Sequence, residues 1–391
     1  MHSIKSITIY PYLYERHVSP LLTAILAFCN NHGVPLKWQV IDSNYLANDW
    51  CGSFWVAVES EGNQATTFCF DMTDWPDIAS PYGLDRCSVY VKRSYSATLI
   101  NNLPSKLRRK IVPYGFYFAC AGTYSDLETW TIFYYWLNTL NSRFVTVIRH
   151  GYVLDATKRF IKAVLKLMLN RQSIPDFLPL SHLTSMDGGD YKVFYQARLW
   201  DPATHKSFTL KTIEEINQTR IALVTQLRAA LGEAYIGGIV PSAYAKKHCP
   251  ELITPHGSDW ASYLNLLSRC KIVVTDTGLH GSIGSKVGEY FGAGRCIVTE
   301  AINFVVPQPP EDGKHWFTYT TVEECIKICQ NLIDNPVQVD AVCNHARAYY
   351  QDYVDPTKTV VDILRTGISR ASTEAASNVA STDAAYGKTL T

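Results

Sequence analysis

The chain alternates short apolar runs with amphipathic stretches, and it does so in two separate series. The first series predicts strands over 5–10, 36–41, 54–58, 67–70 and 87–91, and helices over 20–31, 125–139 and 155–170. The second predicts strands over 191–197, 234–236, 271–275 and 296–299, and helices over 212–231, 259–268, 285–293, 321–333 and 339–365. Strands that alternate with helices indicate an α/β fold with mostly parallel sheets.

Residues 172–191 are rich in proline and glycine and have no clear period, which is typical of a linker. We therefore predict two Rossmann-like domains, over 1–180 and 190–366, that face a cleft. Ligands of such folds bind at the carboxyl ends of the strands, so the cleft is the expected site. The Ser/Ala/Thr-rich tail, 368–391, lacks an apolar period, and we expect it to be disordered.

Composition indicates which binding partners and which cellular compartment to expect. The formal net charge of +1 gives no global basic field, so we expect no nucleic-acid partner. The 11 cysteines follow no paired spacing, the start MHSIKSITIY reads as a strand rather than a signal peptide, and no run of 18 apolar residues occurs. These features favour a cytoplasmic protein.

The segment Lys271–Glu300 is the strongest functional signal. An apolar strand is followed by a loop with three glycines, Gly278, Gly281 and Gly284, then a short helix and a second apolar strand. Glycine lets an anion approach the backbone closely. Ser285 is the predicted N-cap, and the helix start offers unpaired amides and a partial positive charge to a phosphate, to which Lys286 adds a full charge.

Glu289 lies about one turn into that helix, where its carboxylate is placed to accept hydrogen bonds from two ribose hydroxyls. Val287 and Phe291 are expected to face the sheet, and Gly294 to end the helix. The stretch therefore resembles a cradle for a nucleotide diphosphate. The alternative is a structural turn, with a glutamate favoured near the helix start by the dipole alone.

The pattern K-x-x-E-Y-x-x-A-G-R-x-I-V-x-E, residues 286–300, resembles the donor-site helix of bacterial nucleotide-sugar-dependent glycosyltransferases of the GT-B architecture. Residues 197–202 resemble the end of the first strand of the donor domain in these enzymes, and 217–238 the helix and strand after it. Residues 347–364 resemble their closing helix, which crosses back towards the first domain.

The resemblance implies transfer of a sugar from a nucleotide-sugar donor to a glycan, glycolipid or other hydroxyl acceptor, in cell-surface polysaccharide biosynthesis. The donor is a co-substrate, and no cofactor is implied. By the same resemblance Glu289 binds the ribose and Arg198 the diphosphate, for which a planar guanidinium is suited. Lys286 or Lys206 would share the diphosphate. The alternative for Arg198 is a surface arginine after a strand.

Many retaining members place a second glutamate where this chain has Gly281. The departure weakens a retaining assignment and leaves the donor sugar to His280 or to backbone amides. The expected donor-site residues are thus Arg198, His280, Gly281, Ser282, Gly284, Ser285, Lys286 and Glu289. No Asp-x-Asp motif is present, so we expect no essential metal.

An inverting transfer also needs a base. The loop after the first strand holds Glu15 and His17, and both are candidates for deprotonating the acceptor, with His150 as a third. Each of them is otherwise a solvated or structural residue. The basic side of helix 155–170 is either a solvated face or a face that touches membrane lipids carrying the acceptor, at the inner side of the membrane.

Two other functions remain open. One is a nucleotide-sugar epimerase or hydrolase on the same scaffold, in which the residues converge on the sugar and no acceptor is needed. The other is a non-catalytic subunit that binds a sugar nucleotide.

Overall fold

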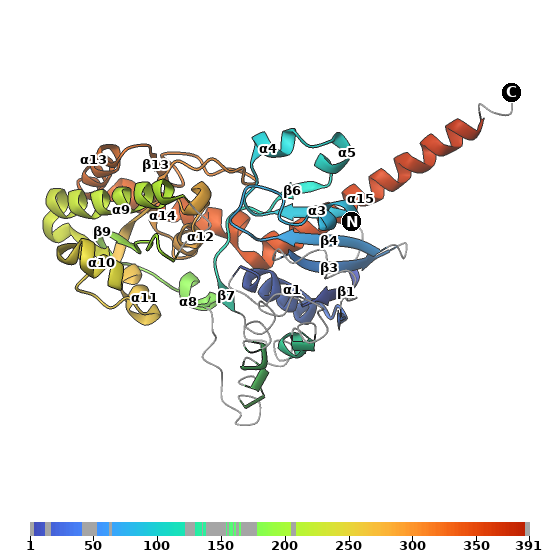
Figure 1. Ribbon diagram of the computed structural model, residues 1–391, viewed down its shortest axis with the longest axis horizontal. Coiled ribbons are helices and arrows are strands. Elements are labelled where there is room, and N and C mark those ends of the chain that lie inside the picture. Colours follow the sequence, from blue (N-terminus) through green and yellow to red (C-terminus); the bar gives the residue numbers. More distant parts are fainter. Residues whose placement is uncertain are drawn as a thin grey trace. The chain divides into compact units, whose positions relative to one another are not determined.

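The computed structural model describes residues 4–11, 17–40, 53–61, 65–121, 130–134, 136–137, 154, 156–158, 160–161, 164–165, 178–204 and 209–387. The chain divides into two compact units. Unit 1 comprises 1–115, 119–179 and 356–391, and unit 2 comprises 116–118 and 180–355. Each unit is an α/β body, as the sequence predicts (Figure 1).

Unit 1 is built on a six-stranded sheet in the order β2-β1-β3-β4-β5-β6. Its strands are β1 (Ile4–Tyr10), β2 (Leu36–Trp38), β3 (Ser53–Ser60), β4 (Ala65–Asp71), β5 (Val89–Lys92) and β6 (Ile111–Pro113). Most neighbours are parallel, but β3 runs antiparallel to both β1 and β4. A separate pair, β7 (Cys120–Ala121) and β8 (Leu178–Pro179), is parallel.

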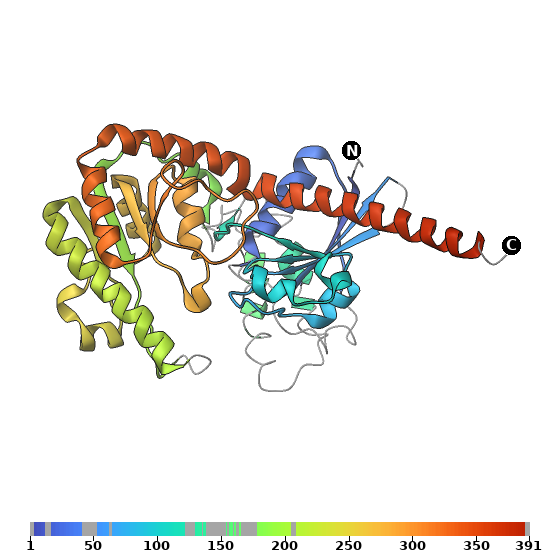
Figure 2. The same cartoon turned by 90° about the horizontal axis from the view of Figure 1, so that it is seen from above.

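The helices of unit 1 are α1 (Ser19–His32), α3 (Pro81–Arg86), α4 (Ala97–Asn101), α5 (Ser105–Arg108) and α15 (Pro356–Gly387). Helix α15 is the long helix at the C-terminus, and it packs against α1 and β4 (Figure 2). At Gly367 the helix comes so close to the sheet that a Cβ would overlap the ring of Phe68. The predicted closing helix therefore does return to the first unit.

Unit 2 has an all-parallel sheet in the order β10-β9-β11-β12-β13. The strands are β9 (Asp190–Ala197), β10 (Tyr235–Ile239), β11 (Cys270–Thr275), β12 (Cys296–Glu300) and β13 (Phe317–Tyr319). After β9 the chain forms β10 on one side of it and then crosses to form β11 on its other side, so the strand order reverses between β9 and β11. In open α/β sheets the carboxyl end of such a switch point is where ligands bind.

The helices of unit 2 are α8 (Leu180–Thr184), α9 (Leu210–Leu231), α10 (Ala243–His248), α11 (Trp260–Arg269), α12 (Ser285–Gly292), α13 (Val322–Ile333) and α14 (Pro336–Tyr349). Short 3-10 turns occur at η1 (Gly232–Ala234), η2 (Pro250–Leu252) and η3 (Leu279–Gly281), and a π turn at η4 (Tyr350–Val354). The starts of most helices follow from local sequence, because side-chain caps accept from the first turn at Thr209, Ser242, Asp259, Thr321 and Asn335.

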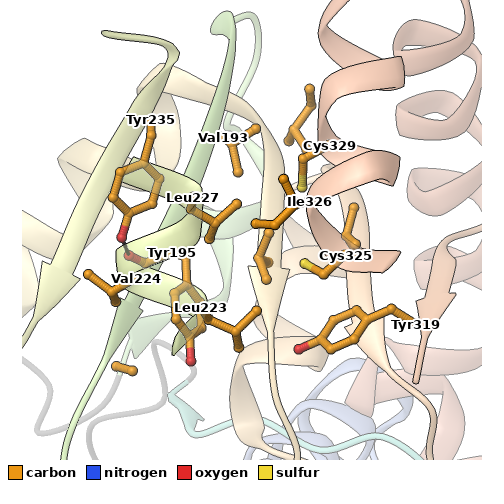
Figure 3. Packing of buried hydrophobic residues seen from close by; sticks show 14 of the residues in the cluster. Val193, Tyr195, Leu223, Val224, Leu227, Tyr235, Tyr319, Cys325, Ile326 and Cys329 are labelled. Carbon is orange, nitrogen blue, oxygen red and sulfur yellow. Dashed lines mark hydrogen bonds between the residues drawn. The ribbon is translucent and has the colours of Figure 1, made fainter. Parts of the chain in front are cut away.

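One core of unit 2 joins alternate residues of its strands to α9, α13 and α14. Figure 3 shows Leu223, Val224 and Leu227 of α9 opposite Cys325, Ile326 and Cys329 of α13. The strand residues on this side include Val193 and Tyr195 of β9. Their neighbour Phe194 therefore lies on the other face of the sheet, where its ring contacts Tyr263 of α11. The helices α11 and α12 cover that second face.

Two predicted features differ from the structure. The single helix expected over 339–365 is divided into α14, the π turn and α15, because Pro356 has no amide proton to continue the helical ladder. Residues 368–387 are helical as the continuation of α15, where the sequence predicted disorder. Most of the helices expected over 125–139 and 155–170 lies outside the described residues, and the cleft between domains stays a prediction.

Candidate functional site

The candidate site of unit 2 lies at the carboxyl end of the switch point between β9 and β11. Strand β9 ends at Ala197 and β11 ends at Thr275, so the next residues, Arg198 and Asp276, leave the sheet side by side. Helix α12 starts above the same edge, since its Lys286 donates a hydrogen bond from Nζ to the carbonyl oxygen of Gln196 in β9. Arg198 and the start of α12 are therefore within a side chain's reach of one another.

A nearly buried ion pair stabilises the carboxyl edge of the unit 2 sheet. Arg220 of α9 donates from Nε to Oδ2 of Asp276 at 2.6 Å and from Nη1 to the carbonyl oxygen of Arg198 at 2.7 Å. The Tyr195 hydroxyl donates to Oδ1 of Asp276 at 3.0 Å. Burial alone would lower the pKa of Arg220, but the carboxylate of Asp276 outweighs burial and the pKa is raised. Arg220 thus stays charged and fixes the backbone at Arg198.

The sequence analysis did not predict this ion pair or the hydrogen bond from Tyr195. Arg220 and Tyr195 stand in a helix and a strand far from Asp276 along the chain. The available signal was Asp276 itself, a carboxylate directly after an apolar strand.

Lys286 is a cation of the site with a lowered pKa. Burial, the largest cause, lowers its pKa to about 8. The carboxylates of Asp276 and Glu289 act in the opposite direction, and the guanidinium groups of Arg220 and Arg198 lower it further. The neighbouring carboxylates therefore do not offset the cost of burying the ammonium of Lys286, and an anion bound at the start of α12 would stabilise the charged form.

Glu289 lies in the second turn of α12 and is only 2% exposed. Its Oε2 accepts a hydrogen bond of 2.6 Å from the hydroxyl of Tyr263. Tyr263 also packs its ring against Phe194 and stacks on Trp260, the first residue of α11. Burial, and then the charge of Glu289, raise the pKa of Tyr263 well above its usual value, so it remains a donor. The carboxylate is thus fixed next to Lys286 rather than solvated.

The helix start is open where the sequence predicts a phosphate cradle. The N-cap is Gly284 rather than Ser285, because Ser285 is already the first helical residue, and no side-chain hydrogen bond caps the helix. A Cβ at Gly284 would meet nothing within 4 Å, and its φ of −66° suits any residue. The packing of the chain therefore does not require glycine at this position. The N-terminus of a helix whose backbone amides have no side-chain cap is suited to binding an anion.

The preceding loop is a compact turn. His280 and Gly281 have φ values of 59° and 66°, in the left-handed region that favours glycine. Gly281 donates to the carbonyl of Gly278 at 3.0 Å, and Gly278 donates to that of Ser282 at 2.8 Å. Ser282 is buried and closes the turn, whereas His280 is exposed. Their predicted roles as donor-site residues stay predictions. Val287 and Phe291 are buried, as expected.

In unit 1, His17 lies just before α1, near the carboxyl edge of the sheet. Its Nδ1 is 3.1 Å from Nη1 of Arg93, the residue that follows β5. Arg93 is itself held by the carbonyl of Met72 at 3.0 Å and by an ion pair with Asp74. Glu15, the other candidate base, lies outside the described residues, as do His150 and Lys206.

A second buried pair, also missed from the sequence, supports the loop after β4. Lys92 and Asp71 are fully buried and form an ion pair of 2.9 Å. Asp71 also accepts from the hydroxyl of Tyr90 at 2.7 Å, and Lys92 donates to the carbonyl oxygen of Trp75 at 2.6 Å. Burial, the largest cause, lowers the pKa of Lys92. The pair holds the loop that carries Asp74.

Among the described residues, no group of three or more His, Cys, Asp or Glu side chains is placed to hold a metal ion. Within the same part of the chain, no helix is long and apolar enough to span a membrane.

No family model and no curated protein matches the sequence. Similar solved structures exist. A glycosyltransferase from Rickettsia africae has 11% identity and a TM-score of 0.42, over 90% of this chain and 81% of its own. Anabaena Alr3699/HepE in complex with UDP has 10% identity and a TM-score of 0.38, over 92% and 97%. A structure named as a UDP-N-acetylglucosamine 2-epimerase from Listeria monocytogenes has 12% and 0.35, over 91% and 72%.

Several of the similar solved structures are named as glycosyltransferases.

Proposed function

We propose that the protein is a glycosyltransferase that takes a sugar from a nucleotide-sugar donor and transfers it to a hydroxyl acceptor. One observation carries the proposal. At the switch point of the unit 2 sheet, Arg198, Lys286 and Glu289 gather around an uncapped helix start. Cations and backbone amides suit a diphosphate, and a carboxylate one turn further on suits the ribose hydroxyls.

In this proposal the diphosphate lies against the first turn of α12. Arg198 and Lys286 neutralise the negative charge that grows on the diphosphate as its bond to the sugar breaks. The protein's own cations would supply this charge, so we propose no essential metal and no cofactor besides the donor. His280, Gly281, Ser282, Gly284 and Ser285 are the proposed neighbours of the phosphates and the sugar.

The ribose would donate to the carboxylate of Glu289, whose Oε2 is already held by Tyr263. A carboxylate fixed in this way is preorganised, and it loses little conformational freedom when the ligand binds. A glycan or glycolipid of cell-surface polysaccharide assembly is the proposed acceptor.

The test is a panel of UDP-, GDP- and CDP-sugars, in which nucleotide release is followed with and without a glycan acceptor and with and without EDTA. Acceptor-dependent release that survives EDTA supports the proposal. Turnover without acceptor would favour the epimerase or hydrolase alternative, and binding without turnover a non-catalytic subunit. Arg198→Met should weaken donor binding, whereas Arg109→Met, at an exposed arginine of unit 1, should not.

Gly284→Val tests the cradle separately. The structure leaves room for a side chain there, so the variant should keep the stability of the wild type. The same side chain would occupy the space proposed for the phosphates, so donor affinity should fall. Unchanged affinity in a stable variant would place the diphosphate elsewhere.

We also propose that the protein is cytoplasmic and associates with the inner face of the membrane. Leu154, Ile161 and Leu165 are at helical positions, have exposed fractions of 58%, 52% and 51%, and are spaced to lie on one side of a helix. Lys158 is exposed on the same side, within the basic stretch 155–170. Apolar and basic side chains on one helix face suit an anionic lipid surface.

Co-sedimentation with vesicles tests this association. Vesicles with phosphatidylglycerol should bind the protein, and vesicles of phosphatidylcholine alone should not. The triple variant Leu154→Ser, Ile161→Ser and Leu165→Ser should stay in the supernatant. Val337→Ser, at an 80% exposed apolar residue of unit 2, is the control that should bind like the wild type. Equal binding of all proteins would refute the role of this face.

A further inference from the structure

The side chain of Gln196 is a buried amide whose donor atom has no partner within the fold. Gln196 is the last residue but one of β9, and it is only 3% exposed. Its Nε2 is buried, and no group in the described part of the chain accepts a hydrogen bond from it. A buried donor without an acceptor lowers the stability of a protein, so such groups are rare and indicate a further partner.

The amide lies on the face of the sheet that carries the start of α12. Tyr195 and Ala197 belong to the core shared with α9 and α13. Because side chains alternate along a strand, Phe194 and Gln196 lie on the other face, which α11 and α12 cover. The carbonyl oxygen of Gln196 accepts from Nζ of Lys286, the second residue of α12. Both ends of Gln196 are therefore near the carboxyl edge where the donor site is proposed.

Lys286 gives a second, independent indication of a missing partner. Its ammonium donates to the carbonyl oxygen of Gln196 and lies 5.9 Å from the ring centroid of Tyr263, which is uncharged. Burial lowers the pKa of Lys286, although the carboxylates of Asp276 and Glu289 act in the opposite direction. This place therefore has more hydrogen-bond donors and more positive charge than the protein itself balances.

The kind of partner follows from the kind of groups that are present. The backbone amides at the uncapped start of α12, the ammonium of Lys286 and Nε2 of Gln196 all donate, and none of them accepts. A sugar hydroxyl would donate as well as accept, whereas the oxygens of a phosphate are strong acceptors that carry negative charge. A set of donors beside a cation therefore suits a phosphate group better than a hydroxyl.

We propose that Gln196 is a further binding residue of this site, whose Nε2 donates to an anionic oxygen of the bound diphosphate. The identity of the ligand as a nucleotide sugar rests on the proposed function, but its chemistry as a diphosphate does not. In the free protein the unpaired amide lowers stability, and in the complex it gains an acceptor. Gln196 is thus retained for binding, at the expense of the stability of the free protein.

Gln196→Met tests this relation between stability and binding. Methionine has a similar length and shape but no N–H donor, so the thermal midpoint of the free variant should equal or exceed that of the wild type. Its affinity for inorganic pyrophosphate and for UDP, measured by calorimetric titration, should fall about 10–100-fold, as for the loss of one hydrogen bond to a charged group. Gln330→Met, at an exposed glutamine of α13, is the control that should bind both probes like the wild type.

Gln196→Glu separates a donor from a residue that only fills space. A carboxylate of the same shape has no donor and repels an anion, so pyrophosphate affinity should fall further than in Gln196→Met. Unchanged pyrophosphate affinity in either variant would overturn the inference. A loss of affinity for UDP but not for pyrophosphate would place the contact on the nucleoside and would also overturn it.

The same measurements distinguish this inference from the proposed function. Binding of UDP and pyrophosphate that depends on Gln196, in a protein that transfers no sugar, would refute the proposed function and support the inference. Sugar transfer with equal donor affinity in the wild type and in Gln196→Met would support the function and refute the inference. No binding of either probe by the wild type would refute both.

Discussion

The pKa of Lys286 gives the sharpest test of the proposed donor site. Burial lowers this pKa to about 8 in the free protein, so about half of the molecules carry the ammonium at pH 8. A bound diphosphate would add negative charge next to Nζ. At about 4 Å and an effective dielectric constant of about 20, each charge pair is worth about 4 kcal/mol, which raises the lysine pKa by about three units. Binding should therefore take up protons.

The expected uptake is about 0.5 proton per bound nucleotide at pH 8, about 0.1 at pH 7 and about 0.9 at pH 9. Because the ammonium is the form that binds, affinity should be about tenfold weaker at pH 9 than at pH 7. The assay is calorimetric titration at pH 8 with UDP-glucose, or with the nucleotide sugar of the panel that binds most tightly, in two buffers of different ionisation enthalpy. Such a donor has no phosphate that titrates in this range.

The matched variants separate Lys286 from the other groups. Lys286→Met should bind more weakly and with no proton uptake, and its affinity should not change between pH 7 and pH 9. Lys327→Met, at an exposed lysine on α13, should behave like the wild type. Binding by the wild type without proton uptake would mean that the diphosphate does not contact Lys286, and the reasoning about this site would be refuted.

Three further predictions concern the same unit. Glu289→Ala should abolish measurable donor binding, and donor affinity unchanged in this variant would count against the ribose role. The variant should also lower the free energy of unfolding by about 1–3 kcal/mol, because it leaves the buried Tyr263 hydroxyl without this acceptor. The control Tyr263→Phe should retain binding. Arg220→Met should lower the free energy of unfolding, measured by denaturant titration, by about 3–5 kcal/mol, because the nearly buried carboxylate of Asp276 loses its cation. A decrease below about 1 kcal/mol would contradict this. The lysine pKa also affects stability, because between pH 8 and 10.5 the unfolded chain binds more protons at Lys286 than the folded chain does. As the pH rises through this range, the free energy of unfolding of the wild type should rise relative to that of Lys286→Met by up to about 3 kcal/mol. Parallel pH profiles of the two proteins would argue against the lowered pKa.

Several elements of unit 2 could be read from the sequence because their signals are local. The apolar strand β11, the glycine loop and the short helix α12 follow one another within 30 residues, and alternation and 3.6-residue periodicity identify them. The division of the last helix also has a local signal, since Pro356 cannot continue the helical ladder, whereas the apolar period alone predicts one continuous helix. The N-cap was misplaced by one residue, because Ser285 has the better capping side chain and Gly284 adopts the position.

The sequence alone determined the two α/β series and the composition of the loop before α12, because backbone hydrogen bonding and side-chain periodicity act between near neighbours. Only the tertiary structure decided which strand lies beside which, and therefore where the order reverses. It also decided that Arg220 pairs with Asp276, and that Arg93 meets His17. Such contacts join residues 56 and 76 positions apart. Their pairing, burial and protonation depend on how the helices pack on the sheets, which no local pattern in the chain records.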